Sequence, residues 1–222
     1  TTGEYNTSVG SLSMGVGITT GGNNVALGHN AAAVLTSGAN NVMAGAYAGD
    51  ALNSGTNNVG IGYGALSSED TGGQNVAIGV NALNTLNYDG NGLNVAVGYA
   101  AGALMSTGTN NTLMGAFSGD ALTTGDYNVA VGYQTGENVT TATNNVLVGA
   151  FAGDALTTGP YNVAIGRSAL SLEDAYGYNV AIGAFALLSQ NAADNAFNVA
   201  VGYNTGQAIT TGVQNVLMGG NA

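Results

Sequence analysis

A five-residue pattern, Asn-Val-Ala-Ile-Gly or a close variant of it, recurs along the chain and alternates as a β-strand does. Its second and fourth positions are mostly Val, Ile or Leu, as in Val76 with Ile78 and Val163 with Ile165. Its third position is apolar as well, and is most often Ala. Because successive strand residues point to opposite faces, the pattern predicts strands that are apolar, and therefore buried, on both faces.

The spacing of the pattern is nearly constant. Successive copies are spaced by 17 positions, as from Asn24 to Asn41, and a weaker copy begins at Asn6. Two steps are longer, at 19 positions, and the first of them runs from Asn75 to Asn94. The two long steps are themselves 104 residues apart, so a block of six units is repeated, and the segment from Asn41 matches the segment from Asn145. The twelve full copies begin at Asn24, Asn41, Asn58, Asn75, Asn94, Asn111, Asn128, Asn145, Asn162, Asn179, Asn198 and Asn215.

A repeat of this length is too short for a helical hairpin or a propeller blade and is typical of one turn of a β-solenoid. A Gly that follows Thr or Ser shortly before most of the repeated Asn residues supplies a turn residue, and Pro160 lies in the same turn. The predicted fold is therefore all-β. It is a β-solenoid, or β-roll, of about thirteen turns, one for each repeat of 17 or 19 positions, and it forms a single repetitive segment over residues 1–222.

The interior of such a coil is predicted to cover only one face of each strand. Two kinds of turn follow the strands, Ala-Leu as at Leu66 and Leu170, and Ala-Gly-Asp-Ala-Leu as at Leu52 and Leu156, which we interpret as two ways of filling one interior. The third-position face is then left to pack against something else, and an identical chain is the simplest candidate. The largest residues of this predicted interchain face are Met43, Leu113, Leu147 and Leu217.

The Asn at the start of every copy is predicted to be structural. In a stack of coils, identical Asn side chains fall one above another and can hydrogen-bond along the ladder. A ligand-binding residue would not need to be repeated in every turn. We therefore expect these residues to form a scaffold.

The composition excludes several classes of function. Only 6% of the residues are charged, the formal net charge is −11, and Arg167 is the only basic residue. Nucleic-acid binding and basic membrane-surface helices both depend on Lys and Arg, so neither partner is expected. No apolar run approaches the ~20 residues that span a bilayer, so no membrane insertion is expected. The chain has no Cys and therefore no disulfide.

Catalytic residues and cofactors are not expected. His29 is the only His, and Tyr133 occupies its place in the next block, which indicates a variable surface position. There is no Cys nucleophile, no His cluster and no phosphate loop joined to a Lys. The carboxylate pairs Glu69-Asp70 and Glu173-Asp174 occupy equivalent places in the two blocks, which indicates turn structure and solubility more than acid–base catalysis.

Three carboxylates are the candidate ligands for a metal ion. Asp120, Glu137 and Asp154 occupy the same place in three successive turns. Stacking would place them about 5 Å apart, where like charges repel unless water or a cation separates them. The expected state is three carboxylates exposed to water, and the alternative is a bound Ca²⁺.

Aromatic residues lie just past the strand in nearly every turn, which favours packing or self-association over the binding of a receptor or glycan. Pairs of Thr also recur, but an ice-binding plane needs Thr at alternate positions, and Asp70 and Asp174 interrupt the column. Ice binding is therefore a minor alternative. The aromatic residues are Tyr47, Tyr63, Tyr99, Phe117, Tyr133, Phe151, Phe185 and Tyr203.

The segments NNVALG, QNVAIG and YNVAIG resemble the NSVAIG repeats in the head of trimeric autotransporter adhesins, although the period here is somewhat longer. Those repeats form a left-handed β-roll in which three chains pack side by side. The longer form TGxxNVAIGxxAL resembles repeats of bacteriophage long tail-fibre proteins and related bacterial surface proteins. The resemblance covers essentially the whole chain. It implies a homotrimeric structural fibre, extracellular or virion-borne, that presents or mediates attachment to a cell surface, and it implies no catalytic residues.

Both ends of the sequence lie inside the repeat. TTGEYN at residue 1 matches TTGDYN at residue 123, and the chain ends partway through a unit. Two interpretations fit this arrangement. The sequence is either part of a longer fibre, or a subunit of a bacterial extracellular filament in which solenoids stack end to end.

Overall fold

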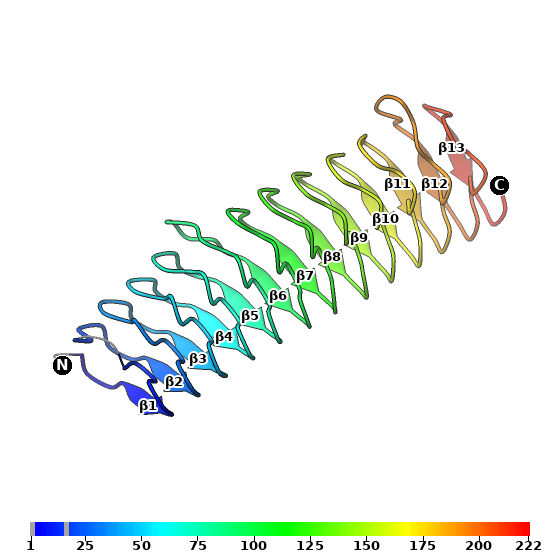
Figure 1. The fold of residues 1–222 in the computed structure, drawn as a ribbon. Helices are drawn as coiled ribbons and strands as arrows, with labels where there is room; N and C mark the ends of the chain where they lie inside the picture. Colours follow the sequence, from blue (N-terminus) through cyan, green and yellow to red (C-terminus); the bar gives the residue numbers. More distant parts are fainter. Residues whose placement is uncertain (1–2, 16–17) are drawn as a thin grey trace. The chain divides into compact units, whose positions relative to one another are not determined.

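The structure, a computed structural model, describes residues 3–15 and 18–222. It divides the chain into two compact units, unit 1 over Thr1–Asn111 and unit 2 over Thr112–Ala222. Each unit is a stack of coils, each built from one short strand and a longer irregular part (Figure 1). The described residues form strands, turns and bends but no helix. The predicted β-solenoid is confirmed, with about 12 turns of roughly 17 residues.

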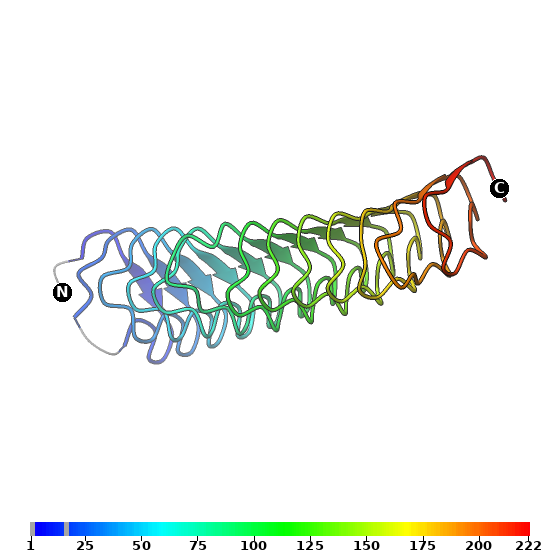
Figure 2. The same cartoon turned by 90° about the horizontal axis from the view of Figure 1, so that it is seen from above.

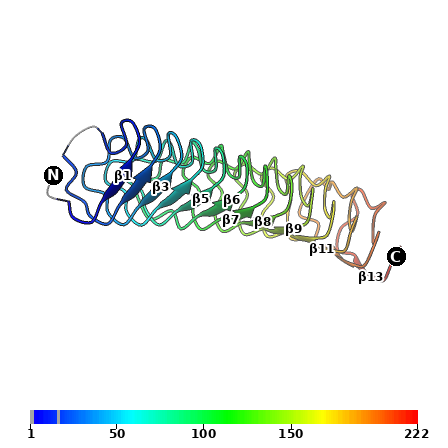
Figure 3. The same cartoon turned by 90° about the horizontal axis from the view of Figure 1, so that it is seen from below.

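Within each unit the strands pair in parallel and in sequence order. Val59 pairs with Val76 in unit 1, and Val163 pairs with Val180 in unit 2. In each unit the strands follow one another along one wall of the coils, and turns make up the rest of each coil (Figures 2 and 3). The strands of unit 1 are β1 (Thr7–Val9), β2 (Val25–Leu27), β3 (Val42–Ala44), β4 (Val59–Ile61), β5 (Val76–Ile78) and β6 (Val95–Val97). The strands of unit 2 are β7 (Thr112–Met114), β8 (Val129–Val131), β9 (Val146–Val148), β10 (Val163–Ile165), β11 (Val180–Ile182), β12 (Val199–Val201) and β13 (Val216–Met218).

Close stacking at the corner after each strand depends on glycine. The N–H of Gly62 donates to the carbonyl of Ala44 at 2.8 Å, which holds neighbouring coils together. Gly62 has a φ of 131°, and a Cβ at this position would lie 2.4 Å from the carbonyl oxygen of Gly79. A side chain would therefore both strain the backbone and separate the coils, which explains the Gly that ends every copy of the pattern.

The third residue of the repeated pattern, which is the middle residue of each strand, faces the interior of the coil, and the second and fourth residues of the pattern face outward. Ala77 and Ala164 are completely buried, whereas Ile61 and Ile165 remain 38% and 37% exposed. The predicted interchain face is therefore wrong for Met43, Leu113 and Leu147, because a single chain already buries these three side chains. Met43 is 0% exposed, and Leu113 and Leu147 are each 1% exposed. Leu217, in β13, is half-buried.

A size match inside the coil explains why the third position points inward. Met43 packs against Gly49, where a Cβ would lie 2.7 Å from the Met43 sulfur. In four coils whose third residue is small, as at Ala164, the residue six places later is a fully buried Leu, here Leu170. In these coils the narrow interior thus takes a large side chain from one position or the other, and this exchange distinguishes the two kinds of turn.

Candidate functional site

The outward strand face is an apolar strip in each unit. Every strand contributes its first and third residues, the second and fourth of the repeated pattern, which are half-buried or exposed and are nearly all Val, Ile, Leu or Met. In unit 1 this strip includes Leu27 and Ile61, and in unit 2 it includes Met114 and Ile165, all of which are exposed. Stacking of coils ~4.8 Å apart aligns these side chains in two parallel rows. The result is a flat surface that is suited to apolar packing.

Charge is almost absent from this side of the coils. We define a strand segment as the eight residues from the one before the repeated Asn to the second after the Gly that ends the pattern, for example 161–168. No strand segment contains Asp, Glu or Lys, and Arg167 is the only Arg in any of them. All twelve carboxylates lie in the remaining parts of the coils. All of the negative charge therefore lies outside the strand segments, and Arg167 inside one of them brings the net charge to −11.

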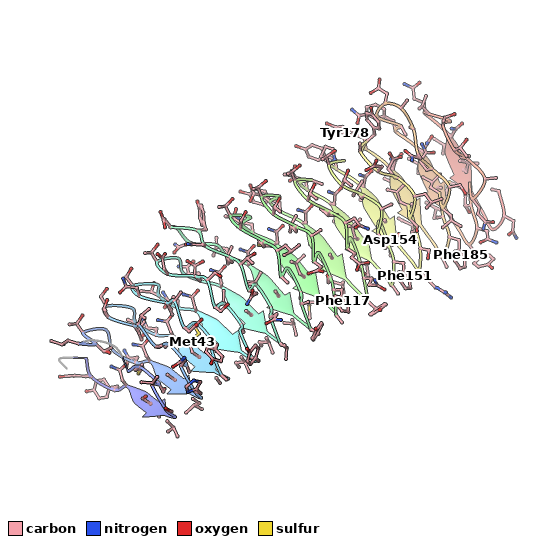
Figure 4. All side chains as sticks on the ribbon, in the orientation of Figure 1. Met43, Phe117, Phe151, Asp154, Tyr178 and Phe185 are labelled. Atoms are coloured by element: carbon pink, nitrogen blue, oxygen red, sulfur yellow. The ribbon has the colours of Figure 1, made fainter. Side chains whose placement is uncertain are left out.

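Aromatic rings occupy both margins of the strands in unit 2. Past the strand ends, Tyr133 and Phe151 pack edge to face with ring centroids 5.5 Å apart. Before the strands, Tyr161, Tyr178 and Phe197 form a parallel stack with centroids 5.1 Å apart at each step. Figure 4 shows Phe151 near the strand ends and Tyr178 at the opposite margin. The two margins therefore extend the apolar strip on both sides.

The predicted aromatic row of unit 1 also packs ring against ring. Tyr47 contacts Tyr63 edge to face at 5.6 Å, and exposed His29 continues the row against Tyr47 at 5.3 Å. His29 thus takes the place of an aromatic residue in this row. In unit 2, the Arg167 guanidinium lies 5.7 Å from the Phe185 ring centre and belongs to the corresponding row.

The repeated Asn residues form hydrogen-bonded ladders within each unit. In unit 1, Asn41 donates its Nδ2 hydrogens to Asn24 Oδ1 at 3.0 Å and to the Gly55 carbonyl at 2.8 Å. Its Oδ1 accepts the backbone N–H of Asn58 at 2.9 Å. The Asn41 side chain therefore ties its coil to both neighbours and also closes its own coil. Asn145 makes the same set of bonds in unit 2.

The three candidate metal ligands lie in one column of unit 2. Burial, and then repulsion by Glu137, raises the pKa of Asp120. Glu137 accepts a hydrogen bond from Gln134 at 2.7 Å, and Asp154 accepts one from the Ser171 hydroxyl at 2.6 Å. Among residues 3–15 and 18–222, no group of three or more His, Cys, Asp or Glu is arranged to hold a metal ion. Calcium binding at this column stays a prediction.

Each unit contains a buried glutamate that the sequence pattern did not reveal as a core residue. Glu69 and Glu173 are 0% exposed, so a role in solubility is wrong for them. Burial raises the pKa of Glu69 to about 7 and also raises the pKa of Glu173. The repeat did carry a signal, because Leu52 and Leu156 occupy the same place one coil earlier.

The carboxyl group of Glu69 is held by backbone donors. Gly72 N–H donates to Oε1 at 2.7 Å, and Tyr88 N–H lies 3.5 Å from Oε2. Asp70 follows directly in sequence, but no nucleophile or second catalytic group is hydrogen-bonded to the Glu69 carboxyl oxygens in the described structure. The arrangement supports the turn and supplies no catalytic pair.

In most of the threonine pairs only the second residue is exposed. Thr140 donates its hydroxyl hydrogen to the Thr157 carbonyl of the next coil at 3.2 Å and is half-buried. Thr141 and Thr158 are exposed. A second exposed row of threonines does not accompany the first in these coils, so the arrangement does not favour ice binding.

Comparison with known proteins does not assign the chain to a family. No protein-family model, curated protein or solved structure matches the chain. The described residues contain no helix of the length and apolar character that crossing a membrane requires.

Proposed function

We propose that this chain is a non-enzymatic structural segment of an extracellular or virion-borne fibre whose copies pack side by side, three to an assembly. The fibre presents, or itself mediates, attachment to a cell surface. The proposal rests on one observation, the uncharged apolar strip on the outward strand face of each unit. The resemblance of the repeats to adhesin heads and phage tail fibres supports the number of chains and the setting.

The distribution of charge favours a second copy of the same chain as the occupant of this strip. A chain with a net charge of −11 repels its own copies wherever carboxylates approach one another. The strand segments carry no carboxylate, so two copies can meet there without that cost. Depletion of charged residues is also characteristic of the centre of protein interfaces.

The solution mass of the chain tests this proposal. We expect light scattering to show a uniform particle of three 21.7 kDa chains. Val146→Glu with Val163→Glu places two charges on the strip, and these should reduce the particle to single chains. Thr141→Glu with Thr158→Glu adds the same charge at exposed positions outside the strand segments and should leave the trimer intact.

A milder pair of variants guards against simple unfolding. Val146→Thr with Val163→Thr keeps the side-chain shape and β-propensity and should weaken assembly by at least tenfold while preserving the circular dichroism spectrum. A parent chain that remains monomeric would refute the proposal. Long filaments of indefinite mass would assign the contact to end-to-end stacking instead. Full retention of assembly by the glutamate pair would show that the strip is not the contact.

A further inference from the structure

We infer that the stacked rings of Tyr161, Tyr178 and Phe197 form a contact surface for a second copy of this chain, an inference that rests on the proposed side-by-side assembly. The three residues come from successive coils of unit 2, and each lies two residues before a strand, β10, β11 or β12. Their side chains are 50%, 41% and 50% exposed. A large apolar surface therefore faces solvent at the margin of the strip.

The fold itself does not require aromatic residues at these positions. The 104-residue repeat provides an internal comparison, because unit 1 places Asn57, Gln74 and Leu93 at the equivalent positions. Their backbone φ values of 59°, 60° and 55° are close to the 59°, 65° and 52° of the aromatic residues. The same turn thus forms with or without rings.

The backbone conformation makes the choice of aromatic residues costly. A positive φ is tolerated best by Gly and Asn and is unfavourable for bulky side chains. Asn occupies this column at several other coils, including Asn40 and Asn144. The turn forms in every coil whatever residue stands here, so three successive exposed aromatic residues are not required by the fold and indicate a role in contact.

The strip alone is too small for a stable interface, so its margins must contribute contact area. Three residues at ~3.3 Å and coils ~4.8 Å apart give roughly 50 Å² of flat surface per strand. The seven strands of unit 2 then offer roughly 350 Å². A typical stable interface takes about 800 Å² from each partner. Large rings beside the strip are the natural source of additional apolar area, since each aromatic side chain buries ~150–250 Å² when covered completely.

We assign the partner as a second copy because the stack continues a surface that is free of carboxylates. Tyr161, Tyr178 and Phe197 each begin a strand segment, and none of those segments contains a carboxylate. Ring faces within the stack already cover one another, so the surfaces left exposed are mainly ring edges and hydroxyl groups. Such edges suit lateral packing against another apolar strip better than the face-on stacking of a planar ligand.

The test replaces the three aromatic residues of unit 2 by the residue types found at the equivalent positions of unit 1. The triple variant Tyr161→Asn, Tyr178→Gln, Phe197→Leu uses side chains that the chain already carries at equivalent backbone positions. We expect a dissociation constant at least 100-fold higher by sedimentation, with an unchanged circular dichroism spectrum. Tyr88→Asn removes an exposed ring outside the strand segments and should leave the dissociation constant unchanged.

Tyrosine nitration gives an independent readout on the parent chain. In the assembled state Tyr161 and Tyr178 should react at least fivefold more slowly than in dilute, dissociated protein, whereas the reactivity of Tyr88 should not change. If the triple variant assembles like the parent and nitration is insensitive to dilution, this inference is overturned while the side-by-side assembly stands. If the parent chain never assembles, both the side-by-side assembly and the aromatic contact surface are refuted.

Discussion

The two units build the same coil but surround one buried carboxyl group differently. Glu69 in unit 1 and Glu173 in unit 2 are equivalent, and each precedes one of the two longer steps of the repeat. In unit 1 the next coil places Leu86 in the same column, and both oxygens of Glu69 lie near backbone donors. In unit 2 the next coil places Gln190 there, and Glu173 Oε2 has no hydrogen-bond partner.

The shared feature shows what the longer step demands. In an ordinary coil, Gly55 N–H donates to the carbonyl of Asp70 in the next coil at 3.3 Å. Before the longer step, Gly72 N–H donates instead to the carboxylate of Glu69, within its own coil. A buried carboxylate thus replaces a backbone acceptor where the register of the coils changes. This explains why a charged residue interrupts an aliphatic column once in each unit.

The largest expected effect on stability comes from the Asn ladder, whose sequence is the same in both units. Substituting one ladder Asn in each unit tests whether the ladder stabilises the two units equally. Asn58→Ala in unit 1 and Asn162→Ala in unit 2 each leave the backbone N–H of the next Asn buried without its acceptor. We expect each change to lower the free energy of unfolding by about 3 kcal/mol. Amide hydrogen exchange of Asn75 and Asn179 measures the loss unit by unit. Losses that differ severalfold between the units would contradict their equivalence.

The second prediction concerns pH and the charge state of Glu69. Burial raises its pKa from 4.5 to about 7, so the folded chain holds a proton that the unfolded chain releases in this range. The free energy of unfolding should therefore fall as pH rises from 4.5 to about 7, by about 2 kcal/mol from this group. Thermal unfolding of Glu69→Gln, which keeps the shape and the acceptor oxygen, should show that much less pH dependence than the parent. An identical pH profile in both chains would refute the assignment.

The smallest expected effect on stability concerns the residue beside the buried glutamate, which is Leu86 in unit 1 and Gln190 in unit 2. Gln190 Nε2 is buried without a partner, while its Oε1 accepts a bond from Asn198 at 3.0 Å. Gln190→Leu restores the residue type of unit 1 and should raise the free energy of unfolding by about 1 kcal/mol, because Asn198 keeps its bond to the Gly212 carbonyl. Leu86→Gln is the reciprocal control and should be destabilising. A loss of stability in Gln190→Leu would indicate that this amide and Glu173 stabilise one another.

Much of the fold was predictable because a short repeat leaves few alternatives. Short strands that recur at every 17th position have to stack on their own copies to form a sheet, and the Asn and Gly of each copy then fall into columns. The position of Glu69 was also encoded, since it aligns with Leu52 and Leu86 in the repeat. Its burial was missed because a carboxylate next to Asp70 in a turn is usually solvated.

The sequence by itself determined the coil, its period and the ladder residues, because these depend on local turn chemistry and on identical residues meeting in register. The inside and outside of the strand were decided only by the tertiary structure. The pattern is apolar at three successive positions, so alternation alone does not say which face is buried. The narrow interior admits Ala77 or, opposite a Gly, Met43, and it leaves the branched side chains of Val76 and Ile78 outside.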